Sequence, residues 1–316
     1  TGIAMAYYGF GVWSLVGSGL VQASSFALLL WVFVKPVNVL RFSTDKIKQH
    51  LRFGYKLMLS SLLDSVYLNS YNVVIGKGFS AQNLGYFTRA NSFKQAPAHN
   101  MGTMVNKVTL PLFAKIQDDD KTLKRAYKKT VRFIVFAMAP LMFFAAAVAE
   151  PLFELLLTEK WVPAAAYFQI LFIVAIVYPL NAFNLNILKV KGRSDYKKAM
   201  AVVILAVAFQ FGMYGLLWAM VAITLLGFTI NSHHSGKFVN YPLAQQMRDI
   251  LPFILIAGAV AVMVRIFDGT FGTRIPYGFL RVLAGLSVGA VLYFPIIRYT
   301  NPELMGEITH FFKRKK

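Results

Sequence analysis

Long apolar segments separated by short loops restrict this chain to one kind of fold. Lipid offers the backbone no hydrogen-bond partner, so a segment that crosses a bilayer does so as a helix of ~20 residues. Charged residues make up only 15% of the chain, against ~25% in soluble domains. The sequence therefore predicts an all-α polytopic membrane protein. About nine helices are expected, at 11–34, 51–75, 84–114, 131–149, 164–188, 199–212, 213–232, 250–267 and 277–298.

The segment Leu84–Ala114 differs from the others in its polar content. At about 100° per residue, its polar side chains fall within an arc of roughly 140°. The members of this arc are Thr88, Arg89, Ser92, Gln95, His99, Asn100, Thr103, Asn106 and Lys107. The other side is apolar except for Lys94. Such a helix either lies in the membrane interface or crosses the bilayer with its polar side toward a water-filled cavity.

The charges of the loops favour crossing. Lys and Arg number 4 in one set of alternate loops and 23 in the other set, at 35–50, 115–132, 189–198, 233–249 and 298–316. Positive residues concentrate in cytoplasmic loops. The alternation holds only if Leu84–Ala114 crosses the membrane, and it predicts a cytoplasmic C-terminus. It also explains the formal charge of +20 without a nucleic-acid partner.

The basic residues Arg89, Lys94, His99 and Lys107 extend over about 27 Å of helix at a rise of 1.5 Å per residue. A cavity that holds several cations and at most one anion prefers an anionic cargo. Pro97 lies between them and predicts a bend near the middle of the helix.

The preceding segment, 51–75, adds three charged candidates. Arg52 and Lys56 lie near its cytoplasmic end, where snorkelling to headgroups is the alternative explanation. Asp64 lies near mid-depth, where a carboxylate costs ~2.5–3.5 kcal/mol on insertion scales. Asp64 is a candidate for ion coupling, or a structural partner of Arg89 or another base.

Other features carry weaker signals. Pro179, Asn181, Asn184 and Asn186 fit a kinked helix that lines a cavity, and helix packing explains them equally well. Trp161 and Tyr167 suit interfacial anchors. His233 and His234 are expected in a loop, and 118–120 is expected to cap the following helix. A turn is expected at Gly9 and Gly11. The chain has no cysteine, and no metal site or cofactor is expected.

Four motifs resemble the Wzx-type polysaccharide flippases of the multidrug/oligosaccharidyl-lipid/polysaccharide exporter (MOP) superfamily. They are LGYFTRA at 84–90, LPLFAKIQDD at 110–119, RFG at 52–54 and YGFGVWSL at 8–15. The resemblance is strongest over 51–132 and fades to hydropathy alone after about 240.

The resemblance implies a MATE-like helical bundle of two six-helix lobes, often with two extra helices. Residues 1–34 would end the first lobe, 35–50 would link the lobes, 51–232 would form the second lobe, and 233–316 would hold the extra helices and a basic tail. On this basis the chain is expected to be an N-terminally truncated fragment.

The expected function is the flipping of undecaprenyl-pyrophosphate-linked oligosaccharide across a bacterial inner membrane by alternating access, without enzymatic chemistry. Expected partners are the lipid-linked oligosaccharide, the bilayer, and a polysaccharide polymerase with its assembly machinery. The residues expected to bind cargo are Arg89, Lys94, His99, Lys107, Arg52, Lys56, Gln95 and Asn106.

Three alternatives stay open. A multidrug cation antiporter of the same fold would need an acidic cavity. The polar spans here offer one acidic residue, Asp64, against several basic ones. A membrane glycosyltransferase or polymer ligase would need a large soluble loop with paired carboxylates. A structural membrane subunit would contain mid-span charges that are unfavourable in the bilayer and that serve no function there.

Overall fold

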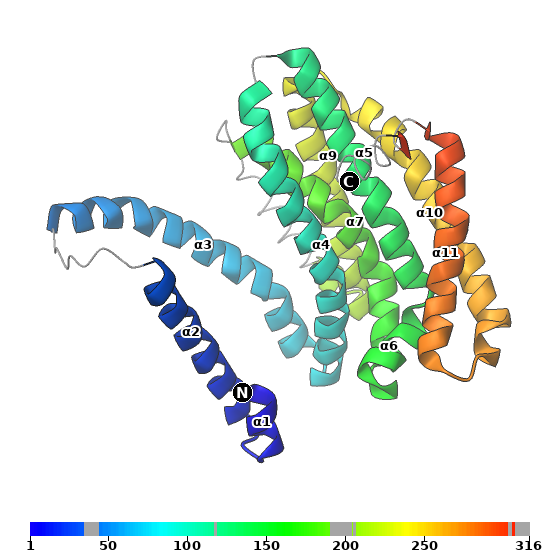
Figure 1. Ribbon diagram of the computed structural model, residues 1–316, viewed down its shortest axis with the longest axis horizontal. Helices are drawn as coiled ribbons and strands as arrows, with labels where there is room; N and C mark the ends of the chain where they lie inside the picture. The colour runs from blue at the N-terminus through cyan, green and yellow to red at the C-terminus, as the bar shows by residue number, and fades with distance from the viewer. Residues whose placement is uncertain (35–43, 117–118, 190–203, 205–206, 303–304, 307–316) are drawn as a thin grey trace. The chain divides into compact units, whose positions relative to one another are not determined.

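The computed structural model describes residues 1–34, 44–116, 119–189, 204, 207–302 and 305–306. All regular structure in these residues is helical, which confirms the predicted all-α class (Figure 1). The elements are α1 (Gly2–Tyr7), α2 (Trp13–Val34), α3 (Thr44–Gly78), α4 (Ala81–Ile116), α5 (Asp120–Ala147), α6 (Ala149–Leu157), η1 (Glu159–Trp161), α7 (Pro163–Lys189), α9 (Gly212–Phe238), α10 (Leu243–Thr270), η2 (Gly272–Arg274) and α11 (Gly278–Thr300).

Six of these helices have the length and apolar composition needed to cross a membrane, which makes the chain a polytopic membrane protein. They correspond to α2, α5, α7, α9, α10 and α11. The helices α3 and α4 are not among them, because polar residues lower their hydropathy, and their crossing stays a prediction. The predicted span at 199–212 lies largely outside the described residues.

The chain divides into two compact units, Thr1–Leu68 and Asn69–Lys316. Within the first unit, α1 packs on α2 across the expected turn. Gly9 and Gly11 have φ angles of +83° and +53°, a region that glycine enters without steric cost. The expected domain boundaries at 34/35, 50/51 and 232/233 stay predictions.

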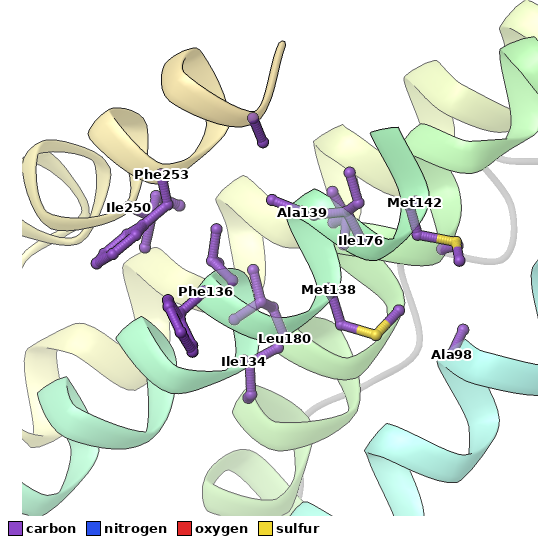
Figure 2. Packing of buried hydrophobic residues seen from close by; sticks show 14 of the residues in the cluster. Ala98, Ile134, Phe136, Met138, Ala139, Met142, Ile176, Leu180, Ile250 and Phe253 are labelled. Carbon is purple, nitrogen blue, oxygen red and sulfur yellow. The ribbon is translucent and has the colours of Figure 1, made fainter. Parts of the chain in front are cut away.

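The second unit is built around α7, which packs against α4, α5, α6 and α9. One apolar cluster joins α5, α7, α10 and α11, and Figure 2 shows Met138 of α5, Ile176 of α7 and Phe253 of α10 within it. A second cluster joins α4, α6, α7 and α9 and includes Phe87 and Phe153. The helices α10 and α11 therefore share a core with α5, although α11 follows it by more than a hundred residues.

A buried polar network lies where the N-terminal parts of α5 and α10 meet the C-terminal parts of α7 and α9. Tyr127 of α5 donates to the side-chain oxygen of Asn184 of α7, and its hydroxyl lies 3.0 Å from Ser235 Oγ of α9. Asn184 Nδ2 donates to Ser232 Oγ at 2.7 Å. Gln246 Nε2 donates to the Ser232 carbonyl at 3.2 Å. These bonds tie four helices together with polar groups that water would otherwise hydrate.

The prediction of a loop over 233–249 is wrong for most of its length. Helix α9 continues to Phe238 and α10 begins at Leu243, so His233 and His234 are helical. Ser232 and Ser235, at the end of the predicted span and in its continuation, bond to side chains of neighbouring helices. In the short connection, Tyr241 donates to the Asp249 carboxylate, and burial together with this bond raises the pKa of Tyr241.

Two further loops can be compared with expectation. The expected connection after 149 contains the short helix α6 and the turn η1. The expected cap before α5 is confirmed for Asp119, whose Oδ1 accepts from the backbone N–H groups of Lys121 and Thr122 at 3.0 and 3.1 Å. Its Oδ2 accepts from the Thr122 hydroxyl, and this bond, ahead of the backbone bonds, lowers the pKa of Asp119.

Candidate functional site

The predicted polar segment forms one continuous helix, α4, with Pro97 and Pro111 inside it. Several of its hydroxyl groups donate to carbonyls one turn earlier on the same helix. Thr88 Oγ1 donates to Leu84 O at 2.7 Å, and Ser92 Oγ donates to Thr88 O at 2.8 Å. These bonds satisfy polar side chains without a second helix. The predicted bend near Pro97 and the crossing of the membrane stay predictions.

Helix α4 has two faces with different environments. The buried face packs mainly on α7 and consists of Phe87, Ala90, Lys94, Ala98, Gly102, Val105 and Thr109. The face that we call the polar face is exposed and consists of Thr88, Arg89, Ser92, Gln95, His99, Asn100, Thr103 and Lys107. Asn106, also expected on the polar arc, is half-buried. The helical period therefore separated the polar side chains from the buried ones, although Val108 and Leu112 of the expected apolar side are exposed.

Lys94 is the exception among the predicted site residues. Only 8% of it is exposed, and it lies on the buried face between Ala90 and Ala98. It has no hydrogen bond or ion pair with any residue that the structure describes. The structure thus separates Lys94 from Arg89, about 140° away around the helix.

Arg89 has an aromatic partner that sequence reasoning missed. Its Cζ atom lies 5.1 Å from the centroid of the Trp161 ring, a cation–π distance. The expectation for Trp161 was an interfacial anchor. Trp161 belongs to η1, far from α4 along the chain, so no periodicity in α4 could have indicated the contact.

Trp161 belongs to a group that we call the aromatic cluster: Tyr86, Trp161, Tyr167 and Tyr214. Edge-to-face contacts join its members, with centroids 6.2 Å apart for Tyr86 and Trp161, 6.4 Å for Tyr86 and Tyr167, and 5.6 Å for Tyr167 and Tyr214. Such contacts favour one arrangement of the rings. The cluster therefore joins α4, η1, α7 and α9 beside Arg89.

Polar side chains of α4 fix two of these rings. Tyr167 donates its hydroxyl hydrogen to Asn83 Oδ1 at 2.9 Å. Gln82 Nε2 donates to the Tyr86 hydroxyl at 2.7 Å. The first turns of α4 thus contribute both Arg89 and the side chains of Gln82 and Asn83, which hold the rings of the aromatic cluster.

The remaining predicted residues fall on α3. Arg52, Lys56 and Asp64 lie within this helix, and their side chains are outside the described residues. Their predicted roles in cargo binding and ion coupling therefore stay predictions.

The predicted polar residues of α7 can be placed more fully, because Asn184 and Asn181 bond to α9. Packing explains both, and the side chain of Asn186 is outside the described residues.

The fold and the polar face define the class: a multi-pass helical membrane protein in which one long helix exposes several cations. Residues 1–166 match the family described as "Polysaccharide biosynthesis protein". The match covers more than half of the chain, which therefore belongs to the polysaccharide biosynthesis protein family.

Three relatives have related names. The chain is 24% identical to the succinoglycan biosynthesis transport protein ExoT of Rhizobium meliloti over 99% of this chain and 65% of the relative. It is 22% identical to the teichuronic acid biosynthesis protein TuaB of Bacillus subtilis over 92% of this chain and 62% of the relative. It is 23% identical to the lipopolysaccharide biosynthesis protein WzxC of Escherichia coli over 69% and 42%. The chain thus spans less than two thirds of each relative's length. No solved structure matches it.

Proposed function

We propose that the full-length protein flips a lipid-linked oligosaccharide across a bacterial cytoplasmic membrane by alternating access. The cargo would consist of a polyprenyl pyrophosphate that carries a short sugar chain. The loops rich in Lys and Arg, and the C-terminus, lie in the cytoplasm under this proposal. A polysaccharide polymerase and its assembly machinery would receive the product.

The polar face of α4 carries the proposal. It exposes Arg89, His99 and Lys107 on a helix that contains no Asp or Glu. A pyrophosphate is strongly anionic, and a guanidinium can bind two of its oxygens through parallel hydrogen bonds. Gln95 and the hydroxyls of this face can donate to and accept from sugar hydroxyls.

The arrangement of α4 in the bundle fits a transported cargo. Its buried face packs on α7, so its polar face is directed away from that contact. Arg52 and Lys56 stay candidate cargo-binding cations on the basis of the sequence. The prenyl tail would remain in the lipid, while the pyrophosphate and sugars follow the polar face.

The nearest alternative, a cation antiporter, would place carboxylates where α4 has bases. The absence of acidic residues from α4 disfavours a cationic cargo. The names of ExoT and WzxC, a transport protein and a lipopolysaccharide biosynthesis protein, also support a saccharide cargo over a drug-like cation.

Arg89 provides the test. In the full-length protein, Arg89→Ala should lower the rate of lipid-linked sugar flipping in proteoliposomes at least tenfold. The reason is that a charge-assisted hydrogen bond contributes roughly 1.5–3 kcal/mol, and 1.4 kcal/mol is a factor of ten. Arg89→Lys should retain an intermediate rate, because it keeps the charge without the two-pronged geometry.

Arg274→Ala is the matched control, since Arg274 is an exposed arginine on η2, away from α4. It should leave flipping unchanged. Flipping by Arg89→Ala at the wild-type rate, with matched amounts of protein in the vesicles, would refute a role for Arg89 in cargo binding.

A further inference from the structure

We propose that Trp161 is a positioning residue for the anion site: its indole ring holds the Arg89 guanidinium ready to bind a phosphate group. The inference rests on the proposed function and identifies a residue through which the site acts. It differs from the role of an interfacial anchor, because an anchor's effect would not depend on Arg89.

The contact leaves the guanidinium free to bind. An arginine has five N–H donors, and a cation–π contact through the ring face uses none of them as a hydrogen bond. Within the described part of the chain, Arg89 has no ion pair, and Trp161 is its one recorded partner. The ring therefore restricts the side chain without neutralising its charge. Restricting a binding group before the ligand arrives lowers the entropic cost of binding.

The frame around Trp161 is itself held on several sides. The Tyr86 ring packs edge-on against the indole, and the Tyr86 hydroxyl accepts from Gln82. The Trp161 backbone N–H donates to the Thr158 carbonyl at 3.0 Å. An anchor that only needed to reach the headgroups would require none of these contacts.

The backbone that presents Trp161 is strained. Thr158, which caps α6 and precedes η1, has φ +85° and ψ 162°, a region that residues other than glycine rarely occupy. Strain of this kind persists only where the surrounding structure imposes it, and it concentrates at functional sites. The strained turn directs the chain toward the aromatic cluster, three residues before the indole.

The first experiment measures binding of inorganic pyrophosphate and of farnesyl pyrophosphate to the full-length protein in detergent. Trp161→Leu should weaken both about two- to fivefold, the range expected for an exposed cation–π contact. Trp161→Phe should recover most of the affinity, because a phenyl ring keeps an aromatic face. In flipping assays, Trp161→Leu should raise KM more than it lowers kcat. Trp218→Leu, which removes an exposed indole of α9, is the control and should change neither.

The second experiment reads the contact directly. In a full-length variant whose only tryptophan is Trp161, adding pyrophosphate should change the indole emission. The same titration with Arg89→Gln added should give no change. The replacements within this chain are Trp13, Trp31 and Trp218, each to Phe.

The outcomes separate the two proposals. If Arg89→Ala loses pyrophosphate binding while Trp161→Leu binds like wild type, the positioning role is overturned and the proposed function stands. If neither variant differs from wild type, Arg89 does not bind the anion, and the positioning role of Trp161 fails with it. Equal effects of Trp161→Leu and Trp218→Leu would mark Trp161 as a general anchor and overturn the inference. Should Trp161→Leu fail to fold, the Phe variant and the emission titration still decide.

Discussion

Removing the hydroxyl of Tyr127 should destabilise the bundle, because this group joins three helices in a fully buried place. Tyr127 is 0% exposed, and its hydroxyl bonds to Asn184 and lies 3.0 Å from Ser235. Tyr127→Phe keeps the ring and leaves Asn184 Oδ1 without its donor. An orphaned buried polar group costs roughly 1–3 kcal/mol, while interhelical bonds in membrane proteins average about 0.6 kcal/mol. We therefore expect a loss of about 1–2 kcal/mol in the free energy of unfolding.

Asn184→Ala should cost more, about 2–4 kcal/mol, because it removes both of the residue's bonds and leaves a small cavity. The double variant should be less destabilised than the sum of the two single variants. Residues in one hydrogen-bond network show coupling of roughly 0.5–3 kcal/mol. The measurement is reversible unfolding of the full-length protein in bicelles by steric trapping.

Thr229→Val is the matched control. The Thr229 hydroxyl is exposed and donates to Leu226 O on its own helix, so its loss should change stability by no more than about 0.5 kcal/mol. The network would lose its proposed energetic role if Tyr127→Phe behaved like this control. Additive single variants would likewise refute the coupling between Tyr127 and Asn184.

Three further predictions follow from the charges and the topology. Because the chain has no cysteine, Ala81→Cys and Lys121→Cys in a full-length cysteine-free protein should label from opposite sides of the membrane; labelling from one side would contradict the crossing by α4. Arg281→Met should cost up to about 3 kcal/mol, since it strands the Asp268 carboxylate, which Arg281 Nε now contacts at 2.7 Å. Adding Asp268→Leu should restore most of this loss, and an unchanged unfolding curve for the single variant would show that the pair contributes nothing. Asp64→Asn should bind cargo but lose the dependence of export on the pH gradient; retained dependence would exclude Asp64 from coupling.

Much of the fold follows from local periodicity. The apolar runs predicted helices at each place where the structure describes one of the six candidate spans. The predicted boundary between the spans 199–212 and 213–232 is also present, because α9 begins at Gly212, whose φ is +74°. The glycine in the sequence predicts this boundary, because glycine adopts a positive φ without strain. The helix ends were less predictable, because helices continue into polar sequence beyond the apolar run.

The polar face of α4 could also be predicted, and for the same reason. A period of 3.6 residues fixes which side chains share a face, so the exposure of Arg89, His99 and Lys107 and the burial of Phe87 and Val105 follow from spacing alone. The anomaly of Lys94 was visible too, as a cation among apolar neighbours.

What the sequence by itself determined is therefore local: the all-α membrane class, the helix positions and the two faces of α4. The tertiary structure alone decided which distant side chains meet. It brought Trp161 over Arg89, and it gave Asn181 and Asn184 of α7 partners on α9. The physical reason is that helical periodicity specifies direction around one axis. Contact between helices depends on how their surfaces pack, and residues distant along the chain jointly decide that packing.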